Sequence, residues 1–154
     1  MPDIVGPETR SHMMSRIGGK NTKPELLIRS GLHRRGYRYR LHDRTLPGRP
    51  DIVLAQWRTI IEVRGCFWHG HDCHLFRWPE TRAQFWRDKI KANVQRDEKN
   101  RAAILGMGWR LAEVWECQLK GRMRRPLADV LDELSRFIEG ANERCVVGPD
   151  KTVL

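Results

Sequence analysis

Two carboxylates on a predicted β-hairpin are the first residues of this sequence that could hold a metal ion. Residues 51–55 and 58–63 are apolar and rich in β-branched side chains, and only two residues separate them, which is short enough for a hairpin turn. A two-residue turn pairs positions whose numbers sum to 113, so Asp51 lies opposite Glu62 with the Cβ atoms about 5 Å apart. Facing carboxylates repel each other, and a hard divalent ion such as Mg²⁺ would neutralise them.

An arginine completes this arrangement. Arg64 lies two residues beyond Glu62 and therefore shares its face of the strand, where a guanidinium could contact a phosphate or stabilise developing charge. The layout matches the Pro-Asp … Glu-x-Lys nuclease site, with arginine in place of lysine. The alternative is a pair of solvent-facing acids on an edge hairpin, one of them paired with Arg64. A slip of one residue in register would place the two carboxylates on opposite faces.

A short loop dense in cysteine and histidine follows the hairpin. Cys66 and Cys73 lie within eight residues of each other, and Cys117 lies near the end of another predicted strand. Thiolates and an imidazole at such spacing suit a closed, tetrahedral Zn²⁺ site, which we favour over free thiols. The histidines that compete for the fourth position are His69, His71 and His74. Cys145 is interpreted as a bystander.

Large aromatic side chains lie in the same loop. Phe67 and Trp68 follow Cys66 directly; core packing is the commoner fate of such residues, and base stacking or intercalation into DNA is the functional alternative. His69 comes next, and a histidine beside a metal-phosphate site can act as general acid or base near neutral pH.

The composition bounds the classes of protein to consider. The chain has 154 residues, enough for one domain with its own core, and a formal net charge of +10 carried by 22 Arg and 7 Lys. Excess positive charge suggests a nucleic-acid partner, and an arginine-rich solvated surface is the alternative. No segment approaches the roughly 18 apolar residues of a transmembrane helix, and the first ten residues lack signal-peptide features. We expect a cytoplasmic protein with reduced cysteines and no membrane partner.

Periodicity and capping signals predict the elements that position these residues. Thr22 caps a helix that Glu25 strengthens as a capping box and that Gly36 ends. Pro126 opens an amphipathic helix that Gly140 ends. The other expected elements are a strand at 37–41, a loop at 47–50, a long helix at 82–105 and a strand at 109–115. This order predicts a single mixed α/β domain with a central sheet flanked by helices, preceded by a mobile arm (1–21) and followed by a disordered tail (141–154).

Several motifs together resemble one family, the very-short-patch-repair (Vsr) mismatch endonucleases, over about residues 9–122. The motifs are Leu46-Pro-Gly-Arg-Pro-Asp51, Gly65-Cys-Phe-Trp-His69, His71-x-Cys73, Phe85-Trp86, Lys89-Ile90, Asn93-Val-x-Arg-Asp97, Gly108-Trp-Arg110 and Val114-Trp-Glu-Cys117. The resemblance implies a restriction-endonuclease-like fold in residues 22–140 and an N-terminal arm that contacts DNA. It also implies a Mg²⁺-dependent nick 5′ of the thymine of a T:G mismatch, which arises by deamination of 5-methylcytosine. The implied partners of the monomer are mismatched double-stranded DNA, a mismatch-repair matchmaker and a repair polymerase.

The resemblance also implies roles for individual residues. Asp51 is similar to the metal-binding catalytic aspartate, and Val63 holds the position whose backbone carbonyl is a metal ligand. His69 resembles the catalytic histidine, and Glu25 matches an acid near the metal, a role that competes with the capping box. The implied zinc ligands are Cys66, His71, Cys73 and Cys117. The implied DNA-intercalating residues are Phe67, Trp68, Trp86 and Met14, which reverses the preference for core packing. The implied DNA-binding residues are Arg49, Lys89, Asn93 and Arg96.

The segment 61–64 departs from the family pattern. The pattern has no acid at 62, threonine at 63 and a second catalytic histidine at 64, whereas this chain has Glu62, Val63 and Arg64. We expect Glu62 to serve as a second Mg²⁺ ligand and Arg64 as the phosphate contact. Two other functions stay open: a restriction-like or nicking endonuclease with altered specificity, and a non-catalytic, zinc-stabilised DNA-binding protein.

Overall fold

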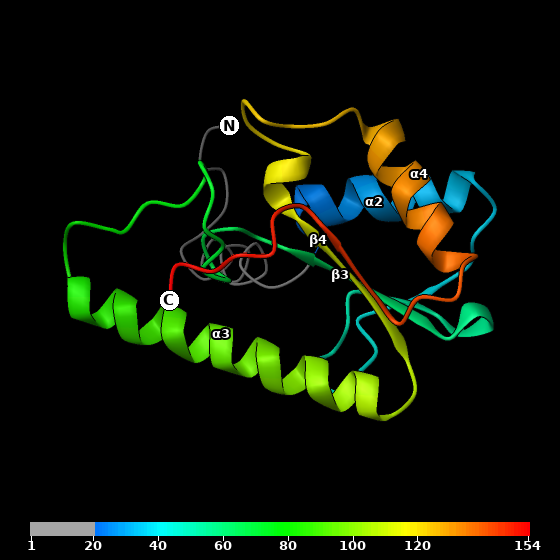
Figure 1. Ribbon diagram of the computed structural model, residues 1–154, viewed down its shortest axis with the longest axis horizontal. Coiled ribbons are helices and arrows are strands. Elements are labelled where there is room, and N and C mark those ends of the chain that lie inside the picture. Colours follow the sequence, from blue (N-terminus) through cyan, green and yellow to red (C-terminus); the bar gives the residue numbers. More distant parts are fainter. Residues whose placement is uncertain (1–20) are drawn as a thin grey trace, which may run out of the picture.

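A five-stranded mixed sheet forms the centre of the computed structural model, which describes residues 21–154 (Figure 1). The strands lie in chain order: β1 (Arg40–Leu41), β2 (Ile52–Leu54), β3 (Thr59–Arg64), β4 (Arg110–Trp115) and β5 (Arg144–Val147). The first three pair antiparallel, and β3, β4 and β5 pair parallel. The mixed sheet confirms the predicted α/β class. Met14 and the rest of the predicted arm, apart from Asn21, lie outside the described residues.

The hairpin formed by β2 and β3 has the predicted register. Ile52 pairs with Ile61 and Leu54 with Thr59, so the paired numbers sum to 113. The turn is longer than the predicted two residues: a 3₁₀ turn spans Ala55–Trp57, and Arg58 follows with φ +49°. A longer turn leaves the register unchanged, because the sum of paired positions does not depend on where the pairing stops.

Helices cover both faces of the sheet. Helices α2 (Lys23–Arg34) and α4 (Leu127–Ile138) pack on one face, and α3 (Ala83–Gly106) crosses the other, as Figure 1 shows. The predicted amphipathic helix is confirmed, because α4 buries its apolar side chains against the sheet and α2. Gly31 allows α2 and α4 to approach closely: a Cβ there would lie 2.4 Å from Leu131 Cδ1.

The C-terminal segment corrects the prediction of a disordered tail. Residues Arg144–Val147 form β5, which pairs with β4 and buries Val147 completely. Beyond β5, Thr152 bridges to His71, and Asp72 N–H donates to the Lys151 carbonyl. The segment is ordered because it satisfies backbone groups along the open edge of β4 and beside the Cys/His loop.

The strand predicted at 37–41 is also shorter than expected, since β1 is limited to Arg40–Leu41. Within residues 21–154, no helix combines the length and apolar character that crossing a membrane requires.

Candidate functional site

Asp51 lies at the centre of the candidate site, directly before β2. The Glu62 carboxylate (Oε1) accepts a 2.8 Å hydrogen bond from Asp51 N–H, and Asp51 Oδ2 accepts one of 2.8 Å from Val63 N–H. Each carboxylate is therefore fixed by the backbone of the neighbouring strand. The numbers of Asp51 and Glu62 sum to 113, as in the pairs of this hairpin, so the two acids face each other as the register predicts.

The potential metal ligands around Asp51 differ from the predicted set. Among the described residues, Glu25, His42 and Asp51 each offer one ligand atom, and these three atoms lie within 4.8 Å of one another. Glu25 comes from the first turn of α2 and is 1% exposed. Its Oε2 lies 2.9 Å from His42 Nε2. The structure thus adds Glu25 and His42 as potential ligands beside Asp51, while the Glu62 carboxylate binds the Asp51 backbone.

Glu25 keeps half of its predicted capping role. Its N–H donates to Thr22 Oγ1 at 3.4 Å, as in a capping box. Its side chain does not return to Thr22: Oε1 accepts from Asn21 N–H at 3.1 Å, and Oε2 accepts from Arg29 at 3.0 Å. The carboxylate can therefore reach the Asp51 side of the sheet.

Burial raises the pKa of both hairpin acids. Burial is the larger cause for Asp51, whose pKa is raised well above its usual range, and the charges of Glu62 and Glu25 act in the same direction. Burial raises the pKa of Glu62 to about 7 against the opposing charge of Arg64. A site of this kind favours a bound cation, because the cation would offset both the burial and the repulsion.

Arg64 has a guanidinium that is surrounded by carboxylates. It is 5% exposed, and its guanidinium donates to Glu113 and to Asp97, at 3.0 Å in each case. A third carboxylate, that of Glu62, lies 3.7 Å away. The predicted role of Arg64 as a phosphate contact stays a prediction. Parallel pairing places Glu113 of β4 beside Glu62, and α3 supplies Asp97, so acids surround the guanidinium.

His69 has a carboxylate partner that the sequence reasoning missed. Its Nδ1 lies 2.6 Å from Asp97 Oδ2, and Arg64 holds the other oxygen of the same carboxylate. A carboxylate on Nδ1 fixes the orientation of the ring and leaves Nε2 for proton transfer. Asp97 ends the motif Asn93-Val-x-Arg-Asp97, but its contact with His69 follows only from the packing of α3 in the folded chain.

The predicted zinc ligands lie together at the end of β3 and β4. Ligand atoms of Cys66, His71, Cys73 and Cys117 lie within 4.8 Å of one another, and the other two candidate histidines are outside this group. His71 Nδ1 is 3.4 Å from Cys66 Sγ and 3.7 Å from Cys117 Sγ. The hydrogen bond with Cys66 is the main cause that lowers the pKa of Cys117 to about 4, which favours the thiolate that a metal requires.

Neighbouring groups orient the histidine of this cluster. His71 stacks on Trp115 with ring centroids 4.1 Å apart, and its Nε2 lies 2.5 Å from the Pro149 carbonyl oxygen. A hydrogen bond from Nε2 to a carbonyl fixes the tautomer of the imidazole and leaves Nδ1 free to bind a metal. The C-terminal segment therefore takes part in building the cluster.

The candidate intercalating side chains among the described residues form an aromatic cluster outside the buried hydrophobic core. Ring centroids of Phe67 and Trp86 are 5.3 Å apart, and those of Trp68 and Trp86 are 5.9 Å apart. Trp68 is 40% exposed. The structure places these three rings together at the surface, which favours a contact surface over core packing.

The expected DNA-binding residues fall into two groups. Arg49, Lys89 and Arg96 are exposed, as phosphate contacts require. Asn93 is 8% exposed, and its Nδ2 donates to the Trp68 carbonyl at 2.8 Å. Asn93 therefore holds the backbone of an aromatic residue, and its contact with DNA stays a prediction.

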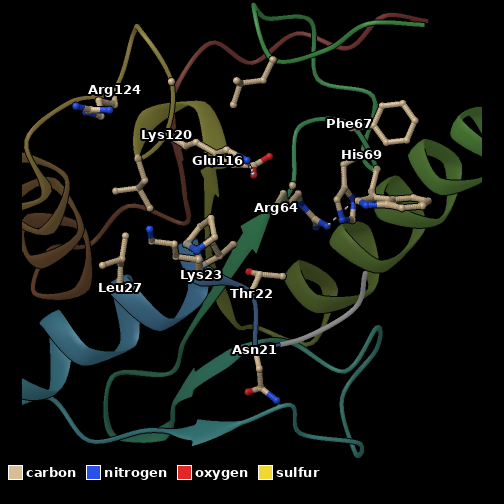
Figure 2. Close-up of a pocket in the computed structure, with 17 residues that line it drawn as sticks. Asn21, Thr22, Lys23, Leu27, Arg64, Phe67, His69, Glu116, Lys120 and Arg124 are labelled. Carbon is tan, nitrogen blue, oxygen red and sulfur yellow. Dashed lines mark hydrogen bonds and ion pairs between the residues drawn. The ribbon is translucent and has the colours of Figure 1, made fainter. Parts of the chain in front are cut away.

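A cavity of about 730 Å³ opens beside His69 (Figure 2). Figure 2 shows Phe67 and His69 at one side and Lys23, Lys120 and Arg124 toward the other. The cavity lies between the first turn of α2, the end of β3 and the segment after β4. A cavity with cationic side chains that ends at a histidine and aromatic rings suits a strand of nucleic acid.

Comparison with known proteins gives this chemistry a context. A family described as DNA mismatch endonuclease Vsr matches residues 2–75. The chain is 46% identical over 134 residues to the Type II nicking enzyme V.XorIIP of Xanthomonas oryzae pv. oryzae, covering 86% of this chain and 98% of that protein. It is 40% identical over 144 residues to DNA mismatch endonuclease Vsr of Escherichia coli, covering 92% of each chain. The Type II nicking enzyme V.NmeAIP of Neisseria meningitidis is 42% identical over 79% of this chain and 87% of its own.

Proposed function

This chain belongs to the Vsr family of DNA mismatch endonucleases, and we propose that it nicks duplex DNA 5′ of the thymine of a T:G mismatch. The observation that carries the proposal is a buried carboxylate site, Asp51 with Glu25, in a chain that also holds a histidine oriented by a second carboxylate. Hydrogen bonds and ion pairs through Glu62 and Arg64 connect the two. The cavity with Lys23, Lys120 and Arg124 in its lining supports a polyanionic substrate. We further propose that the mixed sheet is of the restriction-endonuclease-like type.

The carboxylate oxygens of Asp51 and Glu25 suit Mg²⁺, which prefers oxygen ligands. Asp51 and the backbone carbonyl of Val63 would hold the ion, with Glu25 close by. The chemistry supplied by a bound Mg²⁺ would be polarisation of the scissile phosphate and a lower pKa of a coordinated water. Glu62 would assist through Asp51, because its carboxylate fixes the Asp51 backbone.

The residues of the chain itself would position the strand and move the proton. Asp97 holds His69 through Nδ1, so that Nε2 exchanges a proton with the water or the leaving 3′-oxygen, which leaves a 5′-phosphate. Arg64 holds the Asp97 carboxylate in place while pairing with Glu113. Phe67, Trp68 and Trp86 would open the base stack, which costs less at a mispaired site than at a paired one.

The Cys/His cluster is proposed to hold a structural Zn²⁺, because three thiolates and one imidazole form a closed tetrahedral set. Metal analysis of the purified protein tests this directly: about one zinc per chain is expected, and a value near zero would reject the site. Action as a monomer in the cytoplasm, with a mismatch-repair matchmaker and a repair polymerase as partners, is proposed from the family alone.

A nicking assay tests the proposed function. Hairpin duplexes that carry T:G or T:A at one site are incubated with Mg²⁺ or with EDTA, and a nick is expected only at T:G with Mg²⁺. Asp51→Asn should abolish nicking while DNA binding persists. Full activity of this variant would show that the site is wrongly assigned, and no nick on any duplex would favour the non-catalytic DNA-binding alternative.

A second candidate function is a nicking endonuclease with altered or broader specificity. Two observations favour it: Glu62 and Arg64 stand where the family pattern differs, and two of the relatives described above are named Type II nicking enzymes. A panel of all mismatches and matched duplexes separates the two functions, because only the altered enzyme nicks efficiently outside T:G.

A further inference from the structure

His42 is held beside Asp51 by the sheet itself. Its N–H donates to the Asp51 carbonyl at 3.1 Å, which continues the β1–β2 ladder. In the β1–β2 register, the numbers of paired residues sum to 93, as for Leu41 and Ile52. His42 and Asp51 have the same sum and are therefore the next pair. His42 has φ +49°, so strand alternation does not set the direction of its side chain; the proximity is shown by its ligand atom, which lies within 4.8 Å of that of Asp51. Asp51 thus has Glu62 as its neighbour on one side and His42 on the other.

The positions of the ligand atoms fit a shared cation. Ligands about 2.1 Å from an octahedral ion are about 3 Å apart when adjacent and about 4.2 Å apart when opposite. The ligand atoms of Glu25, His42 and Asp51 lie within 4.8 Å of one another, and His42 Nε2 is 2.9 Å from Glu25 Oε2. The His42 side chain is 19% exposed, so a cation with its waters can reach it from the solvent.

We propose that His42 ligates the catalytic divalent cation through Nε2, beside Asp51 and Glu25. The inference rests on the proposed function, since the cation is the one that the nicking reaction requires. In the ligating form the imidazole is neutral, with its proton on Nδ1. Mg²⁺ takes oxygen ligands, whereas imidazole nitrogen suits transition metals. His42 therefore increases the affinity for Mn²⁺ more than the affinity for Mg²⁺.

The competing explanation is that His42 only donates a hydrogen bond to Glu25, whose Oε2 also accepts from Arg29. The two explanations differ in an observable. A directly coordinated imidazole couples its ¹⁴N nucleus to the electron spin of Mn²⁺, and a histidine that bonds only to a carboxylate does not.

The experiment is electron spin echo envelope modulation of the Mn²⁺-loaded full chain, with and without the nicked product duplex. One equivalent of Zn²⁺ is added first, so that the thiolates of the Cys/His cluster are occupied. His42→Gln keeps a hydrogen-bond donor for Glu25 but removes the imidazole. His33→Gln is the matched control, because His33 is exposed on α2 and outside the cluster.

The wild type and His33→Gln should show histidine nitrogen coupling, which ¹⁵N-histidine labelling changes accordingly. His42→Gln should lose the coupling and bind Mn²⁺ at least about tenfold more weakly. About tenfold is the lower end of the loss in metal affinity that is typical when residues around a metal are replaced. The change in affinity for Mg²⁺ should be smaller. Wild-type protein without nitrogen coupling in both conditions overturns the proposal, and this result needs no variant. Coupling that persists in His42→Gln also overturns it.

A nicking assay on the same preparations separates this inference from the proposed function. Nicking at T:G by a wild type that lacks nitrogen coupling refutes the ligand role of His42 alone. Coupling that depends on His42, in a protein that nicks no duplex, supports the cation site and refutes the endonuclease function.

Discussion

Replacing Glu113 by glutamine removes the centre of the buried ion-pair network behind the candidate site. Glu113 is 1% exposed and accepts hydrogen bonds from three arginines. Arg64 and Arg101 donate to it at 2.8–3.0 Å, and Arg144 donates at 3.0 and 3.2 Å. Glu113→Gln keeps the shape of the side chain but removes the charge that the buried Arg64 shares with Arg101 and Arg144.

The pKa of Glu113 gives the magnitude of the effect. Burial by itself raises this pKa, but the hydrogen bond from Arg101 and the charges of the arginines outweigh it and lower the pKa from 4.5 to about 2. A pKa difference of one corresponds to about 1.36 kcal/mol, so the ionised carboxylate stabilises the folded state by about 3 kcal/mol at pH 7. The same range is found when one partner of a buried ion pair is removed, about 3–5 kcal/mol.

The sign of the pH dependence follows from the lowered pKa. The stabilisation is fully present above pH 4.5, the unfolded value, and is lost as the pH falls through about 2, the folded value. Urea unfolding at several pH values measures the difference between wild type and Glu113→Gln. This difference should be about 3 kcal/mol at pH 7 and fall to about 1.4 kcal/mol at pH 3.

An exposed ion pair supplies the control. Asp132 pairs with Arg35 at 2.8 Å, but its side chain is 52% exposed, so Asp132→Asn should cost less than about 1 kcal/mol. A cost below about 1 kcal/mol for Glu113→Gln at pH 7, or a difference that does not change between pH 7 and pH 3, would refute this reasoning.

Three further predictions concern the site and its supports. Asp97→Asn should lower the single-turnover nicking rate by about 10²–10⁴-fold while DNA affinity is kept, because His69 loses the carboxylate that orients it; an unchanged rate would exclude this role. Cys73→Ser should lower both the zinc content and the thermal midpoint of the protein, measured by metal analysis and calorimetry, and an unchanged midpoint would show that the cluster does not stabilise the fold. Gly70→Ala should lower the free energy of unfolding by about 1–3 kcal/mol, because φ is +62° and a Cβ would lie 2.8 Å from Ile90 Cγ2, and unfolding by urea at the wild-type midpoint would contradict this.

Local patterns in the sequence were sufficient for the elements and for part of the site. The two apolar, β-branched runs at 51–55 and 58–63 predicted a hairpin whose register the structure confirms, because an antiparallel pair keeps one sum of paired positions whatever its turn. The apolar period of α4 and the limits of α3 agree with the structure within a few residues. The close spacing of cysteine and histidine between 66 and 73 likewise pointed to a metal cluster.

Tertiary structure decided which groups meet at the site. From its position on the strand, Arg64 was predicted to contact a phosphate. The parallel pairing of β3 with β4 and the packing of α3 give it three carboxylate partners. His42 comes to Asp51 through the edge strand β1, whose two residues carry little local signal. The segment after 140 becomes ordered only because β4 offers it an open edge.

The sequence by itself therefore determined the helices, the hairpin register and the Cys/His loop, because each depends on residues close together in the chain. The partners of Asp51, Arg64 and His69 depend on contacts between segments 9 to 49 residues apart. Such contacts form only when the strands and α3 pack together, since burial and charge pairing act between side chains that the local pattern leaves independent.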